Sequence, residues 1–553
     1  MMRRLIYRRQ RHALRLLFLA SALCHYSFAS SQLLYRDYQY IKDSDPWLTS
    51  HNSAALTRYA SASLAEAELS LVREKGGFTN YSASADVWQA DARVESFFRL
   101  SQRSVLFGSM SYNSFSGKDM AGSVFTPCFS LSALPSAVDA HRPFDIVEDS
   151  LGNEGDKHCD TYRLTGGFGT DLFKGFSLGA RIDYTAANYA KYKDLRHQNK
   201  LMDLQLTAGF YLPFAKWGAL GANYQYRRTT ESIDFGTYGK GDKTYVSLVD
   251  YGTFMGHIEQ FGNSGFTDKS REMPLVSDYD GLGLQLSLHS PELMFYNSFT
   301  YARRRGYYGR KSPYTITYTD HHADLYTYQA RLTHRTDRSQ YAAELTASIE
   351  NLQNDANTYR ELSNENGATH YEYYGLVKMA NKLWTDLTLA FTARLNILDE
   401  LPVWTLQAGL GRSERQQTSY LYPYFRRQDL SNYRLFASAA RNIATRKGVW
   451  TLAAHASFQQ GEGQPYEDLT FQTPSDKQVP PPTMDAYLAQ EYLFLTAPQY
   501  LVGGSVKYAF LFPGTAMKTY AKATVQQHKA NQTGEHVSGR DHTQASIAIG
   551  CNF

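Results

Sequence analysis

The sequence predicts an all-β protein, a closed transmembrane antiparallel β-barrel of about 18 strands, within a range of roughly 16 to 20. Three observations lead to this fold. The final segment, 541–553, alternates between apolar and small or polar residues. Segments with the same period of two recur along the chain. Short and long connections between them follow one another in order, which is typical of short periplasmic turns opposite long extracellular loops.

The final strand carries the strongest single signal. One of its faces contains Ile547, Ile549, Cys551 and Phe553, and the other contains small or polar residues. A soluble protein with such a terminal strand exposes a sheet edge that promotes aggregation, whereas a closed barrel pairs its last strand with its first. A strand ending in Phe553 also resembles the C-terminal signature of bacterial outer-membrane barrels. This resemblance implies Phe553 as the barrel signal and the barrel-assembly machinery as a partner.

The other alternating segments combine an apolar face with a polar or charged face. A soluble β-sandwich has the same period, so periodicity alone does not identify a membrane barrel. These segments begin near Trp88, Phe176, Leu204, Tyr326, Leu387, Trp450 and Val502.

Connection lengths distinguish the two folds. With both termini on the periplasmic side, eight turns imply nine external loops and about 18 strands. Segment 371–384 fits a loop, an extended strand or an extra hairpin, and 486–495 predicts a short helix within a loop. The longer connections are 117–159, 236–277, 355–382 and 459–499. The short joints lie around Gln102, Gly175, Lys216, Glu292, Arg338, Glu400, Lys447 and Gly514.

Composition agrees with a barrel. The chain has 553 residues, of which 20% are charged and 14% aromatic, with 42 Tyr and a mean hydropathy of −0.46. No segment of the expected mature chain approaches the roughly 18 consecutive apolar residues of a spanning helix. A barrel hides its apolar band among polar lumen and loop residues, and its aromatic girdles use Tyr. The net charge of +4 is too small to favour nucleic acid as a partner.

The N-terminus predicts export. Arginines precede an apolar stretch, 16–23, which small residues follow, so we expect residues 1–31 to be a signal peptide. The expected mature chain consists of an N-terminal lumen segment, 32–61, and the barrel, 62–553. Together these features predict the cell outer membrane of a Gram-negative bacterium.

Two cysteines of the expected mature chain fall in one long connection. Cys128 and Cys159 both lie in 117–159, which we expect to be irregular. In an oxidising compartment they are candidates for a disulfide that staples an external loop, and two separate thiols are the alternative. Their spacing has no metal signature.

No catalytic or phosphate-binding motif is found, so the sequence predicts neither an enzyme nor a cofactor. Charged residues on the predicted lumen face favour anionic solutes through a slight basic excess, or else they pair with one another or with a plug. A cationic run, Arg303-Arg304-Arg305, lies near an external strand end, where lipopolysaccharide phosphates or plain solvent would surround it. The lumen candidates are Arg93, Arg163, Arg181, Asp183, Asp203, Arg227, Arg331, Arg394, Arg434, Lys507, Lys518 and Lys522.

The N-terminal lumen segment carries a family resemblance. Asn52-Ser53-Ala54-Ala55-Leu56 resembles the Asn-Pro-Ala-Ala-Leu opening of fatty-acid-transporter-like barrels, with Ser53 where that family has Pro. In that family the segment sits inside the lumen as a hatch. The resemblance therefore implies Trp47, Asn52 and Ser53 as hatch residues, and a periplasmic tail or a structural lumen filler is the alternative.

The whole expected mature chain, Tyr-rich and running from Gln32 to Phe553, resembles uncharacterised outer-membrane barrel families of Bacteroidota. An 18-stranded barrel is wide enough for an aqueous channel unless it is plugged. The leading hypothesis is a porin-like channel for passive or facilitated passage of a small solute. The alternative is a non-transporting barrel subunit that partners TonB-dependent uptake, secretion or barrel-assembly machinery. The expected surroundings are outer-membrane lipid and lipopolysaccharide.

Overall fold

The computed structural model describes most of the expected mature chain. The expected signal peptide, Cys128 and Phe553 lie outside the described residues, so the predictions for them stay predictions. The described residues are 37–59, 63–127, 142–148, 154–173, 175–263, 267, 273–312, 314–363, 369–512, 517–535, 537 and 539–552.

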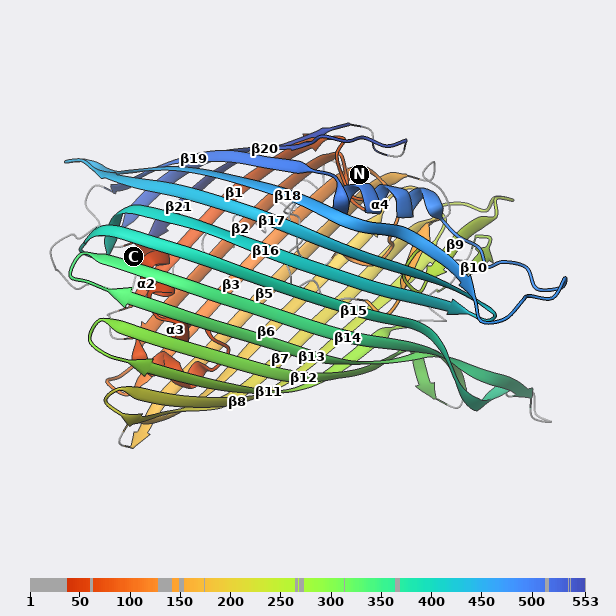
Figure 1. The fold of residues 1–553 in the computed structure, drawn as a ribbon, viewed down its shortest axis with the longest axis horizontal. Coiled ribbons are helices and arrows are strands. Elements are labelled where there is room, and N and C mark those ends of the chain that lie inside the picture. Colours follow the sequence, from red (N-terminus) through yellow and green to blue (C-terminus); the bar gives the residue numbers. More distant parts are fainter. Residues whose placement is uncertain are drawn as a thin grey trace.

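One antiparallel sheet of 18 strands closes on itself, which confirms the predicted barrel (Figure 1). Strand β1 (Leu64–Gly76) pairs with β2 (Asp86–Arg99) on one side and with β21 (Asp541–Asn552) on the other. No strand of this wall is left as an edge. The remaining wall strands are β3 (Ser104–Met120), β5 (Gly155–Phe173), β6 (Phe176–Lys191), β7 (Arg196–Ala215), β8 (Gly218–Gly236), β11 (Leu275–His289), β12 (Leu293–Ser312), β13 (Thr315–Arg335), β14 (Ser339–Ser363), β15 (Thr369–Leu398), β16 (Leu401–Leu421), β17 (Tyr424–Ala444), β18 (Gly448–Thr470), β19 (Gln499–Leu511) and β20 (Lys518–Ala530).

The two faces of each strand differ as the alternation predicts. In β21, Ile547 and Ile549 are 61% and 65% exposed on the outside, whereas Ala548 between them is 8% exposed. Large apolar side chains are exposed in the same way on neighbouring strands, as Leu69 and Leu71 of β1 illustrate. An outward apolar band around a polar lumen is the arrangement of a barrel surrounded by lipid.

The predicted short joints all fall between consecutive wall strands, at the end of the barrel where β1 begins and β21 ends. Residue 174 and residues 513–516, in two of these joints, lie outside the described residues. At the opposite end, long connections join β1–β2, β3–β5, β8–β11, β18–β19 and β20–β21. The connections β6–β7, β12–β13, β14–β15 and β16–β17 at that end are short, and the paired strands β14 and β15 extend beyond their neighbours β13 and β16. External loops and prolonged hairpins therefore share this end.

The segment 355–382 is not the long loop that we expected. Strands β14 and β15 stay paired over the described parts of this segment, up to Ser363 opposite Thr369, and the hairpin projects from the barrel in Figure 1. Tyr359 packs its ring against Tyr371 and Tyr373, with ring centroids 5.7 and 6.1 Å apart. Such aromatic cross-strand contacts stabilise the paired state, so the extended-strand alternative is the right one.

The loop within segment 117–159 is also shorter than we expected. Cys159 lies within β5, opposite Phe115 of β3, and not in irregular chain. Its thiol is buried on the lumen side, 3.6 Å from the Thr161 hydroxyl. The prediction of a Cys128–Cys159 disulfide stays open, because Cys128 is not described.

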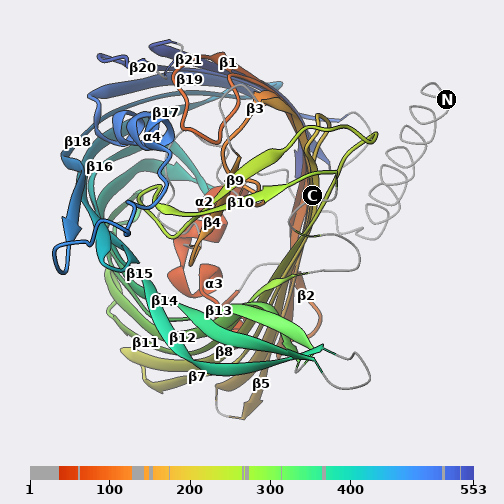
Figure 2. The ribbon, with the colours of Figure 1, turned by 90° about the vertical axis from the view of Figure 1, so that its right-hand side faces the viewer.

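Inside the barrel, short helices fill the end that carries the short turns: α2 (Tyr38–Ser44), α3 (Pro46–Thr49) and the 3-10 helix η1 (Ser53–Arg58) (Figure 2). Tyr38, Leu56 and Tyr59 pack against Phe97 and Val105 beside the β2–β3 turn. We call residues 37–59 the plug. No helix within the described residues is long and apolar enough to cross a membrane.

Parts of the long connections lie across the opposite end (Figure 2). They form a small sheet of β4 (Asp145–Glu148), β9 (Tyr245–Asp250) and β10 (Gly256–Phe261), and the helix α4 (Asp485–Thr496), which confirms the helix predicted over 486–495. We call this sheet, α4 and residues 78–84 the cap.

The closure of the ring can be tested by a cross-link. Ala67 of β1 lies directly opposite the native Cys551 of β21. We expect Ala67→Cys, in a chain whose Cys128 and Cys159 are replaced by Ser, to form a disulfide, because directly opposed strand residues match its Cα separation of about 4.4–6.8 Å. Faster migration in non-reducing gels would report the closed loop of chain. Leu69→Cys, two residues along β1, is the matched control and should stay reduced; equal cross-linking of both variants contradicts this register.

Candidate functional site

The plug is held by side chains that begin its helices and by contacts with the barrel wall. Asp45 accepts a hydrogen bond from the Trp47 amide and so begins α3, in which Pro46 occupies the first turn. The Trp47 ring lies between Tyr211 and Tyr296, with edge-on centroid distances of 5.1 and 5.2 Å. Trp47 is 1% exposed. The indole thus fixes α3 against strands β7 and β12.

Asn52, the second predicted hatch residue, links the plug to two strands. Its side-chain oxygen accepts from the Ala54 amide and caps η1. Its amide nitrogen donates to the Phe210 carbonyl at 2.8 Å and to the Gln285 side chain at 3.1 Å. A residue that caps a helix and bonds the wall at once determines both the start and the position of η1.

A cradle of lumen-facing glycines lets the backbone of η1 touch the wall. A methyl group at Gly169 would overlap the Ser53 carbonyl oxygen, and one at Gly179 would overlap the backbone of Ala54. A methyl group at Gly167 would lie 2.9 Å from the Ser53 hydroxyl oxygen. Asn52 occupies the corresponding space beside two further glycines, Gly209 and Gly221. Only residues without a side chain permit this close approach.

Charged and polar groups hold the rest of the plug. The Tyr38 hydroxyl donates to the Glu95 carboxylate at 2.6 Å, and the Lys42 ammonium lies 2.7 Å from the same group. On the other side, the Arg394 guanidinium lies 3.8 Å from Asp43. The plug therefore spans the lumen from β2 to β15.

A chamber of about 790 Å³ lies in the lumen on the side of the cap. Strands β15 to β18 contribute one wall, the cap contributes another, and β1 and β21 contribute Glu74 and His542. No residue of the plug lines the chamber. Polar and charged side chains of both signs surround the space, and aromatic rings lie among them.

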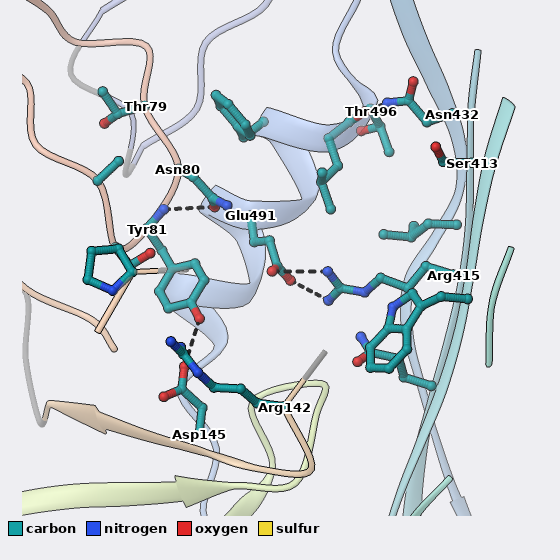
Figure 3. A pocket seen from close by; sticks show the side chains of 18 of the residues that line it. Thr79, Asn80, Tyr81, Arg142, Asp145, Ser413, Arg415, Asn432, Glu491 and Thr496 are labelled. Carbon is teal, nitrogen blue, oxygen red and sulfur yellow. Dashed lines mark hydrogen bonds and ion pairs between the residues drawn. The ribbon is translucent and has the colours of Figure 1, made fainter. Parts of the chain in front are cut away.

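An ion pair fastens the cap to the wall across this chamber. Glu491 of α4 reaches Arg415 of β16, and two hydrogen bonds of 2.6 and 3.1 Å join the carboxylate and the guanidinium (Figure 3). Both side chains are largely buried, at 10% and 22% exposure. Paired hydrogen bonds of this kind combine strength with a defined geometry.

A second set of contacts lies within the cap. The Tyr81 hydroxyl donates to the Asp145 carboxylate at 3.0 Å (Figure 3). Burial, with the carboxylate of Asp145, raises the pKa of Tyr81 well above its ordinary value, so the phenol keeps its proton. Burial also raises the pKa of the Asp250 carboxyl to about 7, against the opposing effect of Lys382.

Many of the predicted lumen charges lie in pairs on the lumen face. Arg227 binds Asp203 through two hydrogen bonds of 2.7 and 2.9 Å, and Arg181 binds Asp183 through two of 2.7 and 2.8 Å. Arg93 pairs with Glu95 beside the plug. In these pairs the opposite charges neutralise one another, as in the second alternative that the sequence left open for the lumen charges.

The other lumen candidates form no common site. The Lys507 ammonium lies 3.9 Å from the centre of the Tyr520 ring, and Lys522 is opposite Lys507 in the register. Of the predicted lumen candidates, Arg434 alone lines the chamber. Arg163, Arg331 and Lys518 lie on the lumen faces of β5, β13 and β20.

The residues that sequence reasoning missed come mostly from the long connections. Tyr81, Asp145, Asp250 and Glu491 lie in cap segments, which have no strand periodicity that would place them in space. The predicted helix around Glu491 was the one available signal. Within the described residues, no group of three or more His, Cys, Asp or Glu is placed to hold a metal ion.

The chain belongs to DUF6850, a family of unknown function, whose profile matches residues 53–553. No curated protein sequence matches it. Among solved structures, it resembles BauA, the ferric preacinetobactin receptor of Acinetobacter baumannii, with 9% identity and a TM-score of 0.39, over 88% of this chain and 80% of that one. It also resembles a FadL homologue of Pseudomonas aeruginosa (10%, 0.32, over 91% and 92%) and the toluene transporter TbuX of Ralstonia pickettii (10%, 0.32, over 91% of each). At these TM-scores the likenesses say nothing of this chain's function.

The glycine cradle yields a prediction about the plug. Gly169→Val places a branched side chain where the Ser53 carbonyl now lies, so we expect η1 to leave its seat at a cost of roughly 1–3 kcal/mol. Hydrogen exchange followed by mass spectrometry should show faster exchange across the plug. Gly166→Val is the control, because Gly166 faces outward on the same strand and a methyl group there would meet only the Ile182 side chain, at 3.4 Å. Unchanged exchange in folded Gly169→Val protein contradicts the cradle.

Proposed function

We propose that this DUF6850 barrel is an outer-membrane channel through which a small polar solute passes, passively or by facilitated passage, by way of the chamber. The observation that most supports this proposal is the chamber itself, about 790 Å³ in volume, between the cap and the plug. Pockets of this size accommodate small molecules. The barrel contributes the wall, and the chain's own cap and plug restrict access from the two ends.

The lumen outside the chamber also supports passage. Thr327 of β13 and Gln407 of β16 belong to the lumen-facing rows of their strands, and both are exposed. Exposed polar side chains inside a barrel indicate water in the lumen. The solute proposed here thus has an aqueous compartment next to its site.

The position of the plug suggests a route. Its hydrogen bonds, ion pairs and ring contacts within the described residues reach strands β2 to β15 and the turn after β15. The wall beyond, from β17 to β21, presents polar residues to the lumen beside the rings of Phe436 and Tyr520. Among these polar residues is His455, whose ring nitrogen lies 3.1 Å from the Gln526 side chain. We infer that a solute leaves the chamber along these strands, beside the plug.

A second candidate function is a barrel subunit within a larger outer-membrane assembly. The hairpin of β14 and β15 favours it, because its projecting part carries exposed apolar side chains: Tyr374, Leu376 and Val377 are 60%, 57% and 46% exposed. Exposed apolar groups of this kind mark interaction surfaces. In this alternative the plug and the cap keep the lumen permanently closed.

The lipid environment is part of the proposal. In the cationic run of β12, Arg304 faces the lumen and is 3% exposed, whereas Arg303 and Arg305 are exposed on the outer face. Outward arginines near the external end suit the phosphates of lipopolysaccharide. Contacts with barrel-assembly machinery, proposed from Phe553, belong to the same expectation.

Single-channel conductance in planar bilayers tests the channel. We expect the refolded full chain to give small conductance steps, and a variant lacking residues 37–59 to give larger ones, because the deletion removes the plug from the lumen. Circular dichroism and heat-modifiable migration in gels should first show that both proteins are folded. Silence of both folded proteins contradicts the channel and favours the closed subunit.

The ion pair of the cap gives an independent prediction. Glu491→Gln removes the carboxylate that holds Arg415, so we expect α4 to be displaced more often and the conductance to rise or to become noisier. Glu372→Gln is the control, because Glu372 pairs with Arg360 on the hairpin of β14 and β15 and does not line the chamber. If the two variants conduct alike, the Arg415–Glu491 pair does not govern access to the chamber.

A further inference from the structure

We infer that the chamber binds the anionic group of its solute, a carboxylate or a phosphate, at Arg434. This inference rests on the proposed function, since it assigns a ligand chemistry to the same chamber. It concerns one row of side chains on strands β15 to β18, which we call the anion row: Thr388, Gly411, Arg434 and Gln459.

The register of the wall places the anion row side by side. Thr388 of β15 is opposite Gly411 of β16, Gly411 is opposite Arg434 of β17, and Arg434 is opposite Gln459 of β18. All four residues line the chamber. Directly opposed residues on one face of a sheet lie about 4.5–5.5 Å apart at Cβ, so a small ligand can contact several of them at once.

Gly411 leaves room at the centre of the row. A methyl group at this position would lie 3.5 Å from the Thr388 hydroxyl oxygen and 3.9 Å from Nε of Arg434. These are ordinary contact distances, so the space above Gly411 is open and has a hydroxyl on one side and a guanidinium on the other. The glycines beneath the plug differ, because there the backbone and side chains of the plug fill the space.

The polar groups around this space have hydrogen-bonding capacity to spare. Within the described residues, the Arg434 guanidinium makes no hydrogen bond or ion pair; the Phe436 ring lies 5.3 Å from its central carbon. Gln459 is 5% exposed, and its amide makes no hydrogen bond within the same part of the chain. Arg181, Arg227 and Arg415 each hold a carboxylate through two hydrogen bonds.

A guanidinium without a hydrogen-bonded carboxylate, in a partly enclosed site, favours the binding of an anion. Its fork of N–H donors matches the oxygens of a carboxylate or a phosphate, and the Thr388 hydroxyl and the Gln459 amide can donate to the same oxygens. Asp386, on the same strand as Thr388, is an acidic group of the wall that acts electrostatically on Arg434. It lies opposite Ser413, whose hydroxyl donates to it at 2.5 Å. The Asp386 carboxylate repels negative charge, so we expect a ligand with one anionic group and not a ligand with two adjacent ones.

Isothermal titration calorimetry on the refolded full chain tests this assignment, in chloride-free buffer with acetate, inorganic phosphate and neutral glucose as separate probes. We expect acetate or phosphate to bind and glucose not to bind. Arg434→Gln should weaken anion binding by about tenfold or more, because it removes charge-assisted hydrogen bonds. Gly411→Val should weaken it as well by filling the open space while Arg434 stays in place.

Arg441→Gln is the matched control: Arg441 faces outward on the same strand, with its guanidinium 5.1 Å from the Trp404 ring. It should bind the anions like the unchanged protein. Absence of anion binding in the folded full chain, or equal binding by folded Arg434→Gln, overturns the assignment. Calorimetry measures binding independently of passage through the barrel. A folded protein that conducts no ions but still binds acetate at Arg434 therefore contradicts the proposed function and supports the anion site.

Discussion

The ladder between the first and last strands is the interaction on which the rest of the molecule depends. In lipid, each backbone polar group left without a partner costs several kcal/mol, so an open sheet of these strands would be unstable there. The β1–β21 pairing removes the two edges and encloses a lumen. Polar side chains face this lumen because the alternation that sends Ile547 and Ile549 outward sends their neighbours inward.

The two closures of the lumen differ in physical character. The plug is seated by backbone contacts over glycines and by buried rings around Trp47, which leave no space for rearrangement without loss of packing. The cap is fastened to the wall at Arg415 by an ion pair, and buried ion pairs contribute less net stability than their geometry suggests, because of the cost of desolvation. The cap is therefore the closure better suited to opening, and the plug is better suited to narrowing a fixed path.

Sequence reasoning was strongest where local rules act alone. The period of two placed the strands, and turn chemistry placed the short turns, because each depends on neighbouring residues. It was wrong at 355–382, where aromatic pairs such as Tyr359 with Tyr371 prolong a hairpin that looks like a loop from composition. It was wrong at Cys159 for a similar reason, since β3 continues far enough to pair with it.

Most of the candidate site could not be predicted from the sequence. Alternation put Arg434 on the lumen face but gave no sign that, unlike Arg181 or Arg227, it would form no hydrogen bond to a carboxylate of the described residues. Glu491 meets the wall, and Tyr81 meets Asp145 within the cap, only because long connections fold back into the barrel. That folding depends on contacts between segments far apart in the chain.

The glycine cradle has a consequence for the order of assembly. The plug comes before β1 in the chain, while the ring closes only when β21 reaches β1. Seating η1 on β5 to β8 before that last ladder forms avoids threading it through an end that the wall already encloses. A chain whose plug seats slowly must either close around an empty lumen or wait with β1 and β21 unpaired, and unpaired strands recruit other chains. The cradle glycines thus influence how the protein is made as well as its finished interior.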